Sequence, residues 1–234
     1  MHDFFFTQNQ DFTPYTLQHL FIILFFIVFG VLLIQWAKKQ SESIQIRTGN
    51  IFAMAISSIV LLSVGLKIYT NEFDIKEDLP LHLCSLFAII IPILSFTRKY
   101  LYYEIFFFLV LTGTFQSTIT PSDYNFLNLP FLRYWLVHAG LVIFMFYATF
   151  IYNMRPTLKS VFKSFAGMQI YLVCMFVTNY LLGSNYFYTN RKPEVATMLD
   201  AMGEWPYYVI GVELIVIPYF LLIYLPFYLT RKKA

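Results

Sequence analysis

Seven stretches of the chain are almost continuously apolar, and each is close to the length that crosses a bilayer. They cover about residues 17–37, 51–70, 80–97, 100–119, 132–153, 160–183 and 206–229. A helix of about 20 residues spans the roughly 30 Å hydrocarbon core. Backbone groups in lipid need partners within their own segment, and no stretch alternates as a barrel strand does. The pattern therefore predicts an all-α polytopic membrane protein, with about seven transmembrane helices in a single domain over residues 1–234.

Composition agrees with this pattern and excludes several other classes. The chain is 59% hydrophobic and 12% charged, whereas a soluble domain carries roughly 25% charged residues. The net charge is +3. The basic residues lie in short loops and not in one stripe, so no nucleic-acid partner is predicted. Two cysteines give no disulfide framework. The first residues lack a positive region and a cleavage site, so the first stretch is expected to remain as a span.

Lysine and arginine in short loops predict the orientation, because they are enriched on the cytoplasmic side. Of the 16, eleven fall on one side of the predicted spans and five on the other. This bias predicts an outside N-terminus and a cytoplasmic C-terminus, which an odd number of spans allows. It makes residues 71–79, 120–131 and 184–205 outside loops.

Polar side chains within the spans gather toward the predicted outer ends. At about 1.5 Å per residue, they fall within roughly 10 Å of those ends. An ionised side chain at the bilayer centre costs about 2.5–3.5 kcal/mol, so such residues by default mark a site or a buried partner. Each alone also has an ordinary interpretation, as a headgroup contact, an inter-helix hydrogen bond or an apolar filler. Glu104, Gln169 and Cys174 are expected elsewhere. The gathered residues are His19, His82, Cys84, Gln116, Arg133, His138, Asn179 and Glu213.

A cysteine and a histidine in this layer suit nucleophilic chemistry, in which the base takes the thiol proton. Cys84 follows Pro80, which is favoured in a first helical turn, and His138 lies at matching depth on another span. His82 is about 200° around the helix from Cys84, so it is expected to face elsewhere. The layer also contains nitrogen, sulfur and oxygen ligands suitable for zinc. No metal-ligand spacing supports such a site, so neither a metal nor a cofactor is predicted.

Several motifs together resemble the YwaF-like family of bacterial integral membrane proteins. The family is similar to a eukaryotic relative, transmembrane protein 164, a lipid acyltransferase. The resemblance extends over nearly the whole chain. The matching runs are Leu79–Leu86, Thr120-Pro121, Arg133-Tyr134, His138-Ala139-Gly140, Asn179–Tyr186 and Trp205-Pro206.

The resemblance implies a lipid acyltransferase or acyl hydrolase that uses Cys84 and His138 through an acyl-cysteine intermediate. It does not transfer the substrate of the eukaryotic relative, because bacterial lipids differ from those of animals. We expect phospholipid or lysophospholipid substrates and a place in the bacterial cytoplasmic membrane. His82, His19, Gln116, Arg133, Asn179 and Glu213 then have supporting or substrate-binding roles. The alternative from the residues alone is a small-solute transporter with a polar pocket at the outer face. The clustering toward one end argues against it, since transporter sites usually lie near the midplane.

Overall fold

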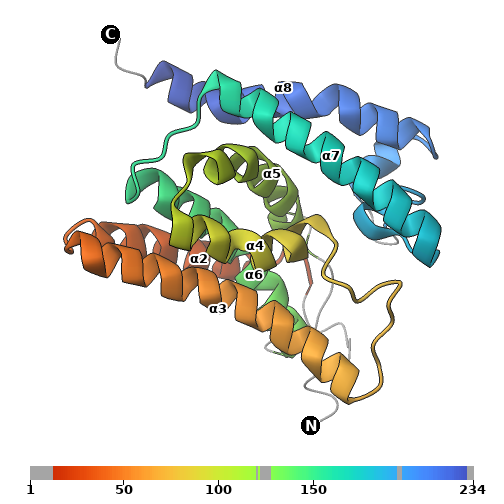
Figure 1. Cartoon of the computed structure of the whole chain (residues 1–234), viewed down its shortest axis with the longest axis horizontal. Coiled ribbons are helices and arrows are strands. Elements are labelled where there is room, and N and C mark those ends of the chain that lie inside the picture. Colours follow the sequence, from red (N-terminus) through yellow and green to blue (C-terminus); the bar gives the residue numbers. More distant parts are fainter. Residues whose placement is uncertain (1–12, 120, 122–127, 194–196, 231–234) are drawn as a thin grey trace.

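The computed structural model describes residues 13–119, 121, 128–193 and 197–230, and the regular structure in this part of the chain is entirely helical. The prediction of an all-α fold is confirmed (Figure 1). Two short 3₁₀ helices, η1 (Tyr186–Tyr188) and η2 (Met198–Met202), lie between the last two α-helices. The α-helices are α2 (Leu17–Ala37), α3 (Glu42–Tyr69), α4 (Leu83–Thr97), α5 (Tyr100–Ile119), α6 (Leu129–Phe150), α7 (Leu158–Leu182) and α8 (Tyr207–Leu229).

Five of these helices, α2, α3, α6, α7 and α8, are long and apolar enough to cross a membrane. A further helix, α4, is apolar but has only 15 residues. The chain is therefore a multi-pass membrane protein. The count of seven crossings and the orientation of the termini stay predictions.

Helix starts agree with the apolar stretches to within three residues, except in α3. This helix begins at Glu42, nine residues before the predicted start at 51. Its first turns mix polar and apolar side chains, so hydropathy does not reveal them. Glu42 nevertheless favours a helix start there, because a carboxylate in the first turn complements the helix dipole.

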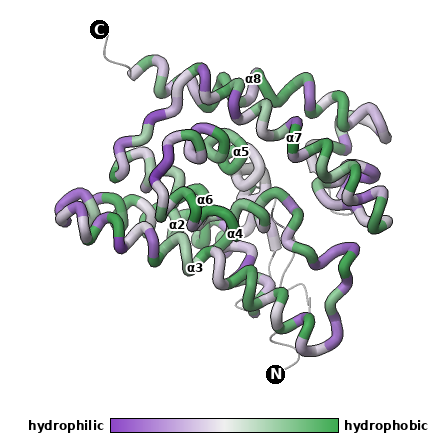
Figure 2. Tube along the Cα trace, in the orientation of Figure 1, coloured by the Kyte–Doolittle hydropathy of each residue, from purple (hydrophilic) through white to green (hydrophobic). Residues whose placement is uncertain are grey.

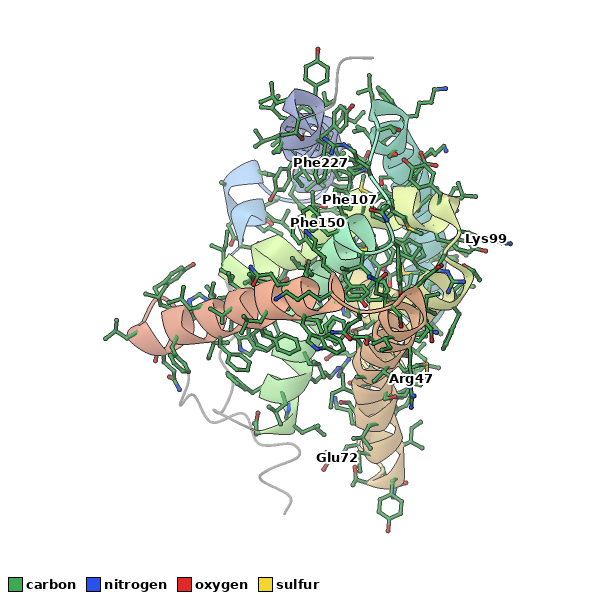
Figure 3. All side chains as sticks on the ribbon, turned by 90° about the vertical axis from the view of Figure 1, so that its left-hand side faces the viewer. Arg47, Glu72, Lys99, Phe107, Phe150 and Phe227 are labelled. Carbon is green, nitrogen blue, oxygen red and sulfur yellow. The ribbon has the colours of Figure 1, made fainter. Side chains whose placement is uncertain are left out.

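Helix α5 runs through the middle of the bundle, between α7 and α8 on one side and α4 and α6 on the other (Figure 1). Its Phe107 is fully buried and meets Phe227 of α8 edge to face, with 5.4 Å between the ring centroids (Figure 3). Its one carboxylate, Glu104, is buried and paired with Lys163 of α7, and it accepts a 2.9 Å hydrogen bond from the Ser160 hydroxyl. This polar group thus joins α5 to α7.

The outer helices expose large apolar side chains along much of their length. Figure 2 shows how many residues of α8 are hydrophobic. On α7, Val173 and Val177 are more than half exposed, and on α8 so are Ile210 and Leu214. On a soluble protein, apolar patches of this kind would mark an interaction surface. Here the hydrocarbon of the bilayer covers them, so the surroundings of α7 and α8 are lipid.

Candidate functional site

Cys84 is the second residue of α4, because this helix begins later than the sequence indicates. The sequence places Pro80 in the first turn, but residues 79–81 form a tight turn in which the Leu81 N–H donates to the Leu79 carbonyl at 2.6 Å. His82 is the N-cap, with extended backbone angles. The predicted start at Pro80 is therefore wrong by three residues. The shift puts Cys84 in the first turn, where the N–H groups have no partner within the helix and the partial positive charge is greatest.

The Cys84 side chain packs against the apolar core between α4 and α5. Gly113 of α5 faces it: a Cβ at this glycine would lie 4.0 Å from the Cys84 sulfur and 3.2 Å from Leu83 Cδ2. A larger side chain at position 113 would therefore occupy the space beside the thiol. Tyr171 of α7 is close enough to interact electrostatically with Cys84, and its hydroxyl donates a hydrogen bond to the Leu81 carbonyl. Three helices thus surround the thiol.

His138 is held by its own helix in one tautomer. Its Nδ1 lies 2.7 Å from the Tyr134 carbonyl oxygen. A carbonyl only accepts hydrogen bonds, so Nδ1 carries the proton and Nε2 carries the lone pair. The Tyr134 ring packs on the imidazole with 4.2 Å between centroids, and the Tyr134 hydroxyl donates to the Ser117 carbonyl of α5 at 2.5 Å. The imidazole is consequently oriented with Nε2 as a ready proton acceptor.

Arg133 links the helix that carries Cys84 to the helix that carries His138. Its Nη2 donates a 3.3 Å hydrogen bond to the hydroxyl of Ser85, the residue after Cys84. The guanidinium is also close enough to interact electrostatically with both His82 and His138. Helices α4 and α6 pack against each other. Arg133 therefore places a positive charge at the first turn of α4.

His82, in the extended N-cap position before α4, packs on η1. Its ring lies 5.3 Å from that of Tyr186 and 5.1 Å from that of Tyr188, between centroids. The Tyr186 hydroxyl donates to the Ile75 carbonyl at 2.7 Å and accepts from the Leu79 N–H at 3.0 Å. These contacts fasten η1 to the loop that leads into α4.

Asn179 organises the turn that carries η1. Its side-chain amide donates to the Tyr186 carbonyl and to the Thr189 hydroxyl, both at 2.8 Å. Its side-chain oxygen accepts from the Ser184 hydroxyl at 2.7 Å and from the Tyr186 N–H at 2.8 Å. With only 1% of its surface exposed, Asn179 acts on the site through η1.

His19 occupies a separate position, at the junction of α2 and α5. Its Nε2 donates to the Thr118 carbonyl at 2.9 Å, and its Nδ1 accepts from the Tyr15 N–H at 3.1 Å. Its Nε2 thus joins α2 to α5, and its Nδ1 holds the turn just before α2. Gln116 is on α5, but its side chain lies outside the described part of the structure.

Within the described residues, no group of three His, Cys, Asp or Glu is arranged to hold a metal ion.

Glu213 lies on the α7–α8 side of the molecule and accepts a 2.6 Å hydrogen bond from Gln169 Nε2. The sequence predicts Gln169 outside the polar layer and Glu213 within it, yet the two side chains meet. Residue counts from helix ends do not give the relative position of two helices along their axes. Glu213 also lines a mainly apolar pocket of about 170 Å³ between α7, α8 and the two 3₁₀ helices.

Two residues of η1 that line this pocket are missed by sequence reasoning. Phe187 and Tyr188 both have left-handed backbone angles, with φ of 59° and 54°. Such a conformation costs about 1–2 kcal/mol for each non-glycine residue, and strain of this kind clusters at functional sites. The Phe187 ring meets that of Tyr171 with 4.8 Å between centroids. No local signal in an aromatic Tyr-Phe-Tyr run predicts this geometry.

Comparison with known proteins gives one match. The model of the TMEM164 family matches residues 14–224, which is nearly the whole chain. A search of curated proteins and a search of solved structures gave no significant match. The matched region contains α2 to α7 in full and most of α8.

Proposed function

We propose, from the premise that the chain belongs to the TMEM164 family, that it is a membrane enzyme that moves acyl chains between phospholipids through Cys84 and His138. The observation that carries this proposal is the link through Arg133. The Arg133 guanidinium donates a hydrogen bond to Ser85, the residue after Cys84, and Arg133 lies on the same helix as His138. The proton of the neutral His138 ring is on Nδ1, so Nε2 can accept one. Arg133 thus connects the first turn of α4, which bears the proposed nucleophile, to α6, which bears the proposed base.

In the first half of the reaction, His138 Nε2 takes the proton of the Cys84 thiol. The sulfur attacks the ester carbonyl of a phospholipid, and the carbonyl oxygen becomes an oxyanion. The N–H groups in the first turn of α4, which have no partner within the helix, suit this charge, as donors fixed in advance do in other acyl transfers. Collapse of the intermediate breaks the ester C–O bond, and His138 gives its proton to the departing lysophospholipid oxygen. An acyl thioester on Cys84 remains.

In the second half, His138 takes the proton of an acceptor hydroxyl, which attacks the thioester carbonyl. A lysophospholipid acceptor gives a transferase, and water gives a hydrolase. The C–S bond breaks, and the sulfur leaves as thiolate and recovers its proton from His138. In this scheme Arg133 binds the lipid phosphate near the reacting ester, because a guanidinium matches phosphate oxygens in charge and geometry.

The test uses purified protein in nanodiscs with a phospholipid that carries a fluorescent acyl chain and a lysophospholipid acceptor. We expect Cys84→Ala and His138→Ala each to lower acyl transfer at least about 100-fold, the lower range for loss of a general base. Cys174→Ala is the matched control, because this cysteine is exposed on α7, and it should retain full activity. Full activity in both site variants would refute the mechanism. A solute-transport function predicts instead that ligand binding survives Cys84→Ser and that no acyl transfer occurs.

A further inference from the structure

The residues of α8 that line the pocket run from Tyr208 to Glu213, and each of these two makes a hydrogen bond to another element. At the end near the start of α8, the Tyr208 hydroxyl donates to the Tyr188 carbonyl at 2.6 Å. Five residues further along α8, about 7–8 Å at 1.5 Å per residue, Glu213 accepts the hydrogen bond from Gln169 of α7. Between these two contacts the lining is apolar and includes Met168, Leu172, Val209 and Val212. The result is a short apolar slot along the helices.

The size of the slot fits a segment of hydrocarbon chain. Its volume is about 170 Å³, which is close to the roughly 150 Å³ of an apolar cavity that accepts a benzene molecule. About six carbon atoms therefore fit. The surfaces of α7 and α8 beside the slot are lipid-facing, since Val173 and Leu214 are 62% and 72% exposed. The acyl chains of the surrounding lipids are therefore the molecules next to the slot.

Two contacts connect the lining of the slot to the residues just before α4. Phe187 lines the slot and packs on the Tyr171 ring. Tyr171 in turn is bonded to the turn before α4 and lies near the thiol. A chain attached at Cys84 and passing Tyr171 and Phe187 would therefore end in the slot. The strained backbone of Phe187 and Tyr188 holds two aromatic rings along this path.

We propose that this slot binds the distal part of the phospholipid acyl chain, and that the Gln169–Glu213 hydrogen bond closes its inner end and limits the chain length. The proposal rests on the acyl-transfer function, which it deepens by assigning a subsite for the acyl chain. A polar pair at the end of an apolar slot disfavours further hydrocarbon, because a chain that displaced it would leave partly buried polar groups unpaired. Chains that reach the slot should consequently be preferred over chains that stop short of it.

The first arm of the test measures binding without chemistry. The full-length Cys84→Ala protein in nanodiscs is irradiated with phospholipids that carry a diazirine either near the end of the acyl chain or in the headgroup. Peptide mapping should find the acyl probe on the segments around Met168 and Val212, with the headgroup probe elsewhere. Labelling of the slot by the headgroup probe, or acyl labelling confined to lipid-facing positions such as Val173 and Leu214, would overturn the proposal.

The second arm measures chain-length preference in the active protein. Val212→Trp and Val209→Trp each fill the slot, and each should lower the ratio of long-chain to short-chain transfer about tenfold, since one methylene in an apolar pocket changes discrimination about 10–200-fold. Val173→Trp, the same change on the lipid-facing surface, should leave the ratio unaltered. An unchanged ratio in both slot variants would contradict the proposal. If Cys84→Ala retains activity while the slot is labelled, the catalytic mechanism fails and the binding site stands.

Discussion

Replacement of Asn179 by alanine removes four side-chain hydrogen bonds at once from a position that is 1% exposed. Polar contacts average about 0.6 kcal/mol each within a membrane bundle and about 1 kcal/mol in soluble proteins. The four together should therefore lower the free energy of unfolding by about 2–4 kcal/mol. For a chain of this size, that loss corresponds to a fall in Tm of roughly 5–15 °C.

The measurement is thermal unfolding of the purified protein in detergent, read by differential scanning fluorimetry, together with acyl transfer. Thr178→Ala, one residue earlier on the same helix, is the control and should change stability by less than about 0.5 kcal/mol. Transfer should fall in Asn179→Ala even below its Tm, because η1 no longer holds Phe187 beside Tyr171. A variant that unfolds within 1–2 °C of the wild type, a change of under about 1 kcal/mol, would refute this account of the turn.

Three further substitutions have defined outcomes. Gly113→Leu fills the space beside the Cys84 sulfur. The rate of alkylation of this thiol and the rate of acyl transfer should each fall more than about tenfold. Gly65→Leu is the control, since a Cβ at that position meets nothing within 4 Å. Arg133→Lys keeps the charge but loses the planar fork, so KM for phospholipid should rise several-fold with a smaller change in kcat. Glu104→Ala removes the buried partner of Lys163, and we expect a loss of about 2 kcal/mol in the unfolding free energy, because Lys163 is partly exposed and regains water. Equal stability of Glu104→Ala and wild type in the same thermal assay would contradict that role.

The apolar stretches predict the helices well because lipid imposes one dominant requirement, a run of apolar residues long enough to cross it. The prediction of helix ends fails in the polar segments beside these apolar stretches. The first turns of α3 lie in a mixed polar segment, and their helical structure depends on capping and contacts that hydropathy does not measure. At α4, proline tolerance of the first turn suggests a start at Pro80, whereas the Leu79–Leu81 turn moves it to Leu83.

The candidate site shows a similar division. Residue types make Cys84 and His138 suitable for nucleophilic chemistry, and the family resemblance singles them out. The expectation that His82 faces away from Cys84 assumes a regular helix, but His82 is the N-cap and lies outside α4. The Gln169–Glu213 pair could not be predicted, because residue counts along two helices do not give their relative depth. The left-handed turn at Phe187 and Tyr188 depends on Asn179, whose four partners are fixed only by the folded chain.

The most direct test of the central claim is the mass of the protein after it meets its acyl donor. The wild-type chain is mixed with a phospholipid in the absence of an acceptor, and the intact mass and the labelled peptide are determined. The account predicts an added acyl group on the peptide that contains Cys84, removable by hydroxylamine as a thioester is, and absent in Cys84→Ala. Transfer of acyl chains without any adduct on Cys84, or with the adduct on Cys174, would contradict it.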